Sequence, residues 1–476
     1  MVFSSLFFLF VFFIANYIAQ ALMPDIRKKN IVMLSFSLVF YSCAGLGCLL
    51  LMLGLTGICW GSALLISRRK IQREKKNVLI GCVVLVLLIL GIFKYTGFFL
   101  QNFQALFGVP EQIPTIILPI GISFYTFQLL SYVIDVYRGD AEVQEKYWLL
   151  LLYASLFHQC IAGPIVRYRD VNYDILHRKV KIAELSRGIT RFAVGLAKKA
   201  VLANGCAAIV NGALGLGNGE PLTTKLVEAT SVTGMWLVMI AFTLQIYLDF
   251  SAYSDMAIGM GLMCGFHYKE NFNYPYIADS VTDFWRRWHI SLSTFFRDYV
   301  YIPLGGNRKG LARQLLNLLI VWALTGLWHG AGTNFLLWGL YFFVFLALEK
   351  LFLGRLLAKL PKFVGWLYTL PVVAVSWMIF ACDTPALLGS TFRALFGANG
   401  FSEPLSLYLL KSRGALLILC AVVASGLPAR LWQSMKRRIG ANAGTLCEIA
   451  ASLPALALTL SFLIGDSYNP FLYFRF

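Results

Sequence analysis

The chain has 476 residues, of which 59% are hydrophobic and only 13% are charged, against about 25% charged in an ordinary soluble domain. Together with a mean hydropathy of +0.71, this composition excludes a conventional soluble fold and indicates an integral membrane protein. The net charge of +18 does not indicate nucleic-acid binding, because the lysines and arginines lie in short loops between apolar runs, as in the basic cytoplasmic loops of membrane proteins.

The first apolar run, residues 1–23, ends near "AQA" at Ala19–Ala21, which resembles a signal-peptide cleavage site. No basic residue precedes the apolar part, so we expect a retained first span. Two basic loops follow, Arg27–Lys29 and Arg68–Lys76, and both are predicted to face the cytoplasm. The apolar residues between them, 31–67, suffice for a hairpin of two spans, which places the N-terminus outside.

The rest of the chain alternates between apolar runs and short polar segments, with no polar segment large enough for a separate soluble domain. The sequence therefore predicts one all-α, polytopic membrane domain over residues 1–476. We expect about eleven spans of about 20 residues each, plus one or two re-entrant segments. The further runs lie near residues 79–100, 113–134, 147–166, 189–214, 231–263, 315–353, 364–382, 409–427 and 448–464.

The most polar part of this map is residues 267–314, which carry "FWRRWHISLSTFFRDYVYIPLGG" between two apolar blocks. Ser280 followed by Asp283 is typical of a helix start, so a helix is expected from about Val281 through His289 to a break at Pro303. Asp283 precedes Arg286 and Arg287 by three and four residues, a spacing that favours ion pairs along one helix face. Asp283 and Asp298 are together expected to pair with most of the arginines of this segment.

A histidine lies inside the apolar block that follows. His329 is the fifteenth residue of the block that begins at Leu315, which gives about 22 Å of helix, less than the roughly 30 Å of a bilayer core. The "HGAGTN" that starts at this histidine breaks helices, so we expect a discontinuity there. An ionisable residue at membrane depth favours a functional role, although a structural histidine bonded to a carbonyl is the alternative.

His289 is the second candidate, and its polar surroundings make a structural role easier for it than for His329. The other three histidines are less favoured as functional residues. His177 is expected in a solvated loop and His267 at a membrane interface. His158 is expected to pack near a span end, with an entry path as the alternative.

At these residues the sequence resembles the membrane-bound O-acyltransferase (MBOAT) family, in particular its alginate O-acetyltransferase-like bacterial branch. The core motifs lie within residues 118–353. The matching motifs are "LPIGISFYTFQLLSYVIDVYRG" (Leu118–Gly139), "IAGPIVRY" (Ile161–Tyr168), "LDFSAYSDMAIGMG" (Leu248–Gly261), "ENFNYPY" (Glu270–Tyr276), "FWRRWHISLSTFFRDYVYIPLGGNRKG" (Phe284–Gly310), "LTGLWHGAGTNFLLWG" (Leu324–Gly339) and the tail "YNPFLYFRF" (Tyr468–Phe476).

This resemblance implies about eleven spans around a central tunnel, with His329 of "LWHG" as the principal catalytic residue and His289 of "RWHISLS" as the second. One departure is visible, since His158 stands where similar proteins usually carry a proline. The resemblance also implies that acetyl groups pass from a cytoplasmic donor, expected to be acetyl-CoA, across the membrane to an exported polysaccharide such as alginate. No metal is expected.

The chain shows no G-x-S-x-G nucleophile motif and no extracytoplasmic domain, so a separate extracytoplasmic acetyltransferase with a serine nucleophile is the expected partner. The expected location is a bacterial inner or cytoplasmic membrane. Two alternatives stay open at this point. One is D-alanyl transfer from an aminoacylated carrier protein to teichoic acids. The other, of a different class, is a polysaccharide or proton-coupled transporter that uses the histidines as a proton relay.

Overall fold

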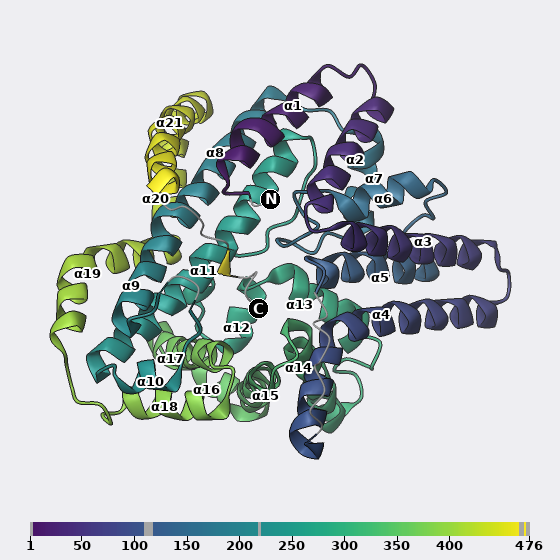
Figure 1. Cartoon of the computed structure of the whole chain (residues 1–476). Coiled ribbons are helices and arrows are strands. Elements are labelled where there is room, and N and C mark those ends of the chain that lie inside the picture. The colour runs from purple at the N-terminus through teal and green to yellow at the C-terminus, as the bar shows by residue number, and fades with distance from the viewer. Residues whose placement is uncertain (1–2, 109–117, 218–219, 466–470, 473–476) are drawn as a thin grey trace. The chain divides into compact units, whose positions relative to one another are not determined.

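The computed structural model describes residues 3–108, 118–217, 220–465 and 471–472 (Figure 1). Every regular element in these ranges is a helix, and none of the described residues forms a strand. The predicted all-α class is therefore confirmed. Residues 113–117 of one expected span, and all of the tail motif except Phe471 and Leu472, lie outside the described residues.

The helices gather into two compact units, which we describe separately. Unit 1 comprises residues 1–192 and 254–270. It begins with a π-helical turn (Phe8–Phe12). Its α-helices are α1 (Phe13–Ala21), α2 (Ile26–Ser42), α3 (Leu46–Arg68), α4 (Gln72–Phe107), α5 (Ile122–Arg138), α6 (Tyr147–Ser155) and α7 (Tyr168–His177). Two further helices, α8 (Ile182–Ala197) and α11 (Val232–Met263), run through both units.

Unit 2 comprises residues 193–253 and 271–476. Its α-helices are α9 (Asn204–Leu214), α10 (Thr224–Glu228), α12 (Val281–Arg287), α13 (Ile290–Phe296), α14 (Gly310–His329), α15 (Thr333–Leu348), α16 (Gly354–Leu357), α17 (Lys362–Ala381), α18 (Pro385–Leu395), α19 (Pro404–Ala424), α20 (Leu427–Ile439) and α21 (Ala441–Gly465). Shorter π- and 3₁₀-helical turns occupy Lys198–Ala203, Pro275–Ile277, Arg297–Tyr301 and Glu349–Leu353.

Within the described ranges, nine helices are long and apolar enough to cross a membrane, fewer than the eleven or so expected. They lie at Leu46–Arg68, Gln72–Gln104, Ile182–Leu214, Val232–Met263, Gly310–His329, Thr333–Leu357, Lys362–Ala381, Pro404–Ala424 and Asn442–Gly465. The difference arises because several apolar runs form helices that are short for a crossing. The first run gives Phe8–Ala21, and α2, α5 and α6 have 17, 17 and 9 residues.

The apolar residues between the two basic loops form two successive helices, α2 and α3, joined by a turn at residues 43–45. Of the two helices expected to span the membrane here, only α3 is long and apolar enough to cross it. The first basic loop lies in the opening turn of α2, where the side chain of Asp25 caps the helix by accepting from the backbone N–H of Lys28 at 2.8 Å. The second basic segment, Arg68–Lys76, covers the last residue of α3, the connection at residues 69–71 and the first turn of α4.

In unit 2, α14 and α15 form a close antiparallel hairpin because glycines face each other where the helices meet. A Cβ on Gly326 would lie 2.4 Å from the carbonyl oxygen of Phe335. A Cβ on Gly339 would lie 2.3 Å from the carbonyl oxygen of Trp322. Small residues allow such close helix approach in membrane proteins, and this contact fixes the end of α14 that carries His329.

Candidate active site

His329 is the last residue of α14, and the chain is non-helical over residues 330–332 before α15 begins at Thr333. The predicted discontinuity is therefore confirmed. The amide of Asn334 secures the far side of this break by donating to the carbonyl oxygen of Phe380 on α17 at 2.8 Å. His329 is half-buried and stands at an interrupted helix, where a side chain can face a cavity.

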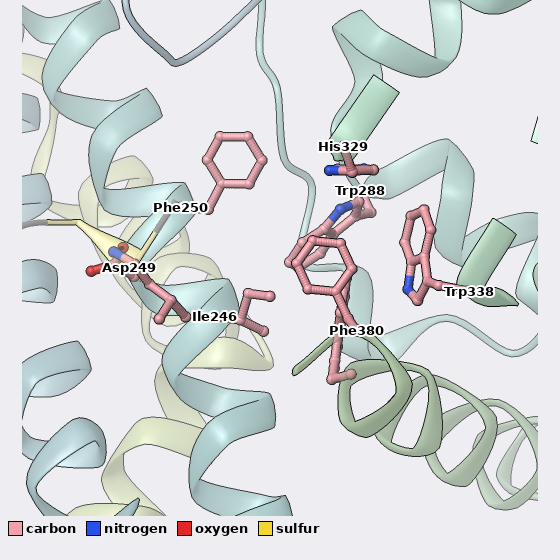
Figure 2. Close-up of a pocket in the computed structure, with 9 residues that line it drawn as sticks. Ile246, Asp249, Phe250, Trp288, His329, Trp338 and Phe380 are labelled. Atoms are coloured by element: carbon pink, nitrogen blue, oxygen red, sulfur yellow. Dashed lines mark hydrogen bonds between the residues drawn. The ribbon is translucent and has the colours of Figure 1, made fainter. Parts of the chain in front are cut away.

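His329 faces a small cavity in unit 2 of about 30 Å³, room for about two water molecules. Figure 2 shows this cavity between side chains of α11 on one side and His329 with its aromatic neighbours on the other. Its walls are apolar except for His329 and Asp249. The lining residues are Ile246, Asp249, Phe250, Trp288, His329, Trp338, Trp377, Phe380 and Leu472.

Aromatic rings fix the orientation of the His329 imidazole. The ring centroids of Trp328 and Trp338 each lie 4.9 Å from that of His329, and the centroid of Phe380 lies 5.2 Å away. All three are in edge-to-face geometry, an arrangement that aromatic groups favour. The imidazole is therefore held in place by packing, as a catalytic side chain must be.

His289 does not continue the helix that starts at Val281, so the predicted helix through this residue is wrong. The start itself is confirmed, because the Ser280 hydroxyl caps it by accepting from the N–H of Asp283 at 3.1 Å. However, α12 ends at Arg287, and His289 adopts a left-handed backbone with φ of +43° before α13 begins. Such a conformation is costly for a residue with a side chain.

The segment around Asn271 imposes this break. The carbonyl oxygen of Asn271 accepts from the N–H of Ile290 at 2.9 Å, and the N–H of Asn273 donates to the carbonyl oxygen of Arg287 at 2.9 Å. These backbone groups would otherwise be satisfied within one continuous helix. A segment some 16 to 18 residues earlier in the chain therefore sets the local conformation of His289.

The Asn271 side chain also assigns the tautomer of His289. Asn271 Oδ1 accepts from the backbone N–H of Ser291 at 3.1 Å and from its hydroxyl at 2.8 Å. It lies 3.2 Å from His289 Nδ1. An amide oxygen only accepts, so we assign the ring proton to Nδ1. Nε2, which is buried and has no hydrogen-bond partner among the described residues, is then the nitrogen that can take a proton.

Burial decides the charge of this second histidine. His289 is 1% exposed, and its desolvation lowers the pKa of the imidazole to about 3, because a charged group is disfavoured in an apolar environment. His289 is therefore neutral at physiological pH. A neutral imidazole is the form in which a histidine acts as a base or accepts a hydrogen bond.

The two histidines share aromatic neighbours, so the structure brings both predicted catalytic residues to one cluster of unit 2. The ring of Phe250, which lines the His329 cavity, lies 4.9 Å from the ring of His289 in edge-to-face geometry. The Trp328 ring lies 6.0 Å from His289 and 4.9 Å from His329.

Ion pairs account for two of the arginines in the polar segment. Arg287 Nε lies 2.7 Å from Asp283 Oδ2, and Arg297 Nε lies 2.7 Å from Asp298 Oδ1. Pairing lowers the cost of placing these charges near lipid. The predicted pairing with Asp283 is therefore confirmed for Arg287, and Arg286 is exposed.

The remaining histidines lie in unit 1. His158 is fully buried, with Nδ1 2.6 Å from the Tyr268 hydroxyl, which fits the expected packing role. His267 Nδ1 lies 3.2 Å from Asp174 Oδ2 and is half exposed. His177 is exposed, but it ends α7 where a loop was expected.

Sequence reasoning assigned no role to Asp249, although this residue lines the cavity with His329. Its motif "LDFSAYSD" was noted without a function. The available signal was the carboxylate itself, since it stands near the middle of a long apolar run and a charge at membrane depth calls for a partner. Asn271, which positions His289, carried no comparable signal because its contact is made only in the folded chain.

Comparison with known proteins identifies the family. Residues 147–391 match the model of the membrane-bound O-acyltransferase family. The chain is 35% identical to the "Probable alginate O-acetylase AlgI" of Azotobacter vinelandii, over all of both chains. It is 37% identical to the protein of the same description from Pseudomonas aeruginosa, over 96% of this chain and 87% of the relative.

A third relative is the "Peptidoglycan O-acetyltransferase" of Helicobacter pylori, 31% identical over 84% of this chain and 81% of the relative. The resemblance drawn from the motifs is thus confirmed at the level of the family. The chain with the His329 cavity belongs to the membrane-bound O-acyltransferase family and is a multi-spanning membrane acyltransferase.

Proposed function

We propose that this protein is an O-acetyltransferase that takes acetyl groups from acetyl-CoA on the cytoplasmic side and passes them across the membrane for O-acetylation of an exported polysaccharide. The observation that carries this proposal is the placement of His329 at a helix break, facing a small apolar cavity, with a neutral His289 in the same aromatic cluster. Family membership supplies the acyl-transfer chemistry.

In the proposed reaction His329 is the general base. It takes the proton from an acceptor hydroxyl whose oxygen attacks the thioester carbonyl. The carbon–sulfur bond then breaks, and the protonated His329 returns this proton to the departing thiolate of the donor. General-base catalysis contributes about 10²- to 10⁴-fold in such reactions. In the tautomer assigned above, Nε2 of His289 is a hydrogen-bond acceptor, so His289 orients the acceptor hydroxyl or another donor group of the substrate.

The surroundings of the two histidines support this chemistry. Apolar walls exclude water, which strengthens electrostatic interactions inside the cavity and protects the thioester from hydrolysis. The Nδ1–H···Asn271 contact leaves His289 Nε2 as the nitrogen available to a substrate group. An acyl transfer of this kind needs no further group from the protein at the reacting carbon.

We infer that the polar segment, residues 267–314, is a re-entrant element that lines a tunnel for the donor, with about eleven membrane crossings in total. The break between α12 and α13 supports this inference, since non-helical backbone at membrane depth is found where it lines a cavity. The acceptor polymer is then reached through an extracytoplasmic acetyltransferase with a serine nucleophile. Relatives named for alginate and for peptidoglycan support a cell-envelope polymer and a bacterial cytoplasmic membrane.

The donor is tested by incubating membranes that contain the protein with radiolabelled acetyl-CoA, and separately with a D-alanyl carrier protein. We expect label to be transferred from acetyl-CoA only. Transfer from the carrier protein alone would favour the D-alanyl alternative. Polymer or proton flux through protein-containing liposomes without an acyl donor would favour a transporter, and the proposed function predicts none.

A further inference from the structure

Two charged side chains meet in the buried part of unit 2. Lys199 and Asp249 are 3% and 2% exposed, and Lys199 Nζ lies 2.6 Å from Asp249 Oδ1. Lys199 belongs to the candidate span Ile182–Leu214 and Asp249 to the candidate span Val232–Met263. Charges in such positions are expensive and mark functional sites more often than structural ones.

Both members of this pair also contact the C-terminal part of the chain. Asp249 Oδ2 accepts from the backbone N–H of Leu472 at 2.8 Å. The ammonium of Lys199 lies 4.8 Å from the centroid of the Phe471 ring, within reach of a cation–π interaction. The Phe471 ring also packs against Tyr253, with 5.0 Å between the two ring centroids.

Leu472 also lines the His329 cavity, as does Asp249 itself. In Figure 2 Asp249 lies on the α11 side of the cavity, opposite His329. The ion pair and the cavity wall are therefore linked through Asp249. One oxygen of its carboxylate pairs with Lys199, and the other accepts from the N–H of Leu472.

We propose that Asp249 and Lys199 are positioning residues whose ion pair holds Phe471 and, through it, Leu472 in place as part of the wall of the His329 cavity. This inference rests on the proposed function for its catalytic consequence, which is that acetyl transfer requires Leu472 in this position. Lys199 is paired with one carboxylate oxygen of Asp249, and the N–H of Leu472 uses the other carboxylate oxygen as its acceptor.

A purely structural pair would only tie α11 to the helix that carries Lys199. Exchanging the charges, Lys199→Asp with Asp249→Lys, separates the two roles. The exchanged pair restores the attraction between the helices, but it places an ammonium, which only donates, where the N–H of Leu472 needs an acceptor.

The position of Leu472 is measured by cross-linking. Ile246→Cys and Leu472→Cys place thiols at two walls of the same cavity, in a background in which the ten native cysteines are replaced. We expect disulfide formation under mild oxidation in the otherwise unchanged chain. Asp249→Asn, which leaves only a neutral acceptor, and the charge exchange, which removes the acceptor, should each slow it about tenfold, the effect of weakening or losing a charge-assisted hydrogen bond. Glu228→Gln, which neutralises the carboxylate of a separate ion pair on α10, should not.

Acetyl transfer is measured on the same substitutions in the native-cysteine chain. Asp249→Asn and the charge exchange should each lower the rate of acetyl transfer at least tenfold, with the variant proteins present at normal abundance. Leu472→Pro, which removes the N–H but leaves the ion pair intact, should transfer at least tenfold less than Leu472→Ala, which keeps the N–H. Full transfer and full cross-linking in the exchanged variant would overturn the proposal. If the unsubstituted protein transfers no acetyl, the proposed function fails, and the cross-linking series still decides whether the pair holds the wall.

Discussion

Asn271→Ala tests the role of His289 most specifically, because it removes a contact of this histidine without changing any residue that lines the cavity. Among the described residues, the side-chain oxygen of Asn271 lies 3.1 Å from Ser291 N, 2.8 Å from Ser291 Oγ and 3.2 Å from His289 Nδ1. Each hydrogen bond contributes about 1 kcal/mol, so the left-handed turn at His289 loses about 2 to 3 kcal/mol of support. The left-handed backbone itself costs about 1 to 3 kcal/mol. The lost support is of the same size, so the variant can no longer hold this conformation.

We therefore expect Asn271→Ala to shift His289 away from its active orientation and lower acetyl transfer about 30- to 150-fold, at one decade for each 1.4 kcal/mol. The assay is the initial rate of label transfer from radiolabelled acetyl-CoA by purified protein, corrected for the amount of folded protein. The matched control is Asn273→Ala, because this exposed residue contacts the turn through its backbone N–H. A rate within twofold of wild type for Asn271→Ala would refute the role assigned to this side chain.

Three further predictions concern chemistry, packing and topology. His289→Gln should stay severely impaired at normal abundance, because an amide cannot exchange a proton at neutral pH, and an active glutamine variant would make His289 a structural residue. Gly326→Ala should lower thermal stability and acetyl transfer together, because its Cβ would lie 2.4 Å from a carbonyl oxygen of α15, whereas Gly389→Ala, with no atom within 4 Å of its Cβ, should be tolerated. Cysteines introduced into Arg27–Lys29 and Arg68–Lys76 should be spared by an impermeant thiol reagent on intact cells, and labelling of either loop would reverse the predicted orientation.

Local signals made part of this molecule predictable. The Ser280 cap and the break after His329 follow from residues that are neighbours in the chain, a hydroxyl before a helix and glycines after one. The two successive helices α2 and α3 follow from the length of an apolar run between two basic loops. Each of these features is decided within a few turns of helix, so the sequence alone sufficed.

Features set by distant residues could not be predicted. The left-handed His289 depends on Asn271, and no periodicity in the α12 region reports that contact. The partner of Asp249 is Lys199, on another span, and its second contact comes from Leu472 near the end of the chain. Helix length was overestimated for the apolar runs of α2, α5 and α6, because hydropathy does not report where tertiary packing ends a helix.

The central claim is that His329 is the base of an acetyl transfer from acetyl-CoA. It is tested most directly by comparing His329→Ala with wild type in proteoliposomes supplied with radiolabelled acetyl-CoA and the acceptor partner. We predict that the variant is inserted and folded, as judged by its elution profile and thermal stability, and that its transfer rate is lower by about 10² to 10⁴, the contribution of a general base. Transfer at the wild-type rate by a folded His329→Ala protein would contradict the account.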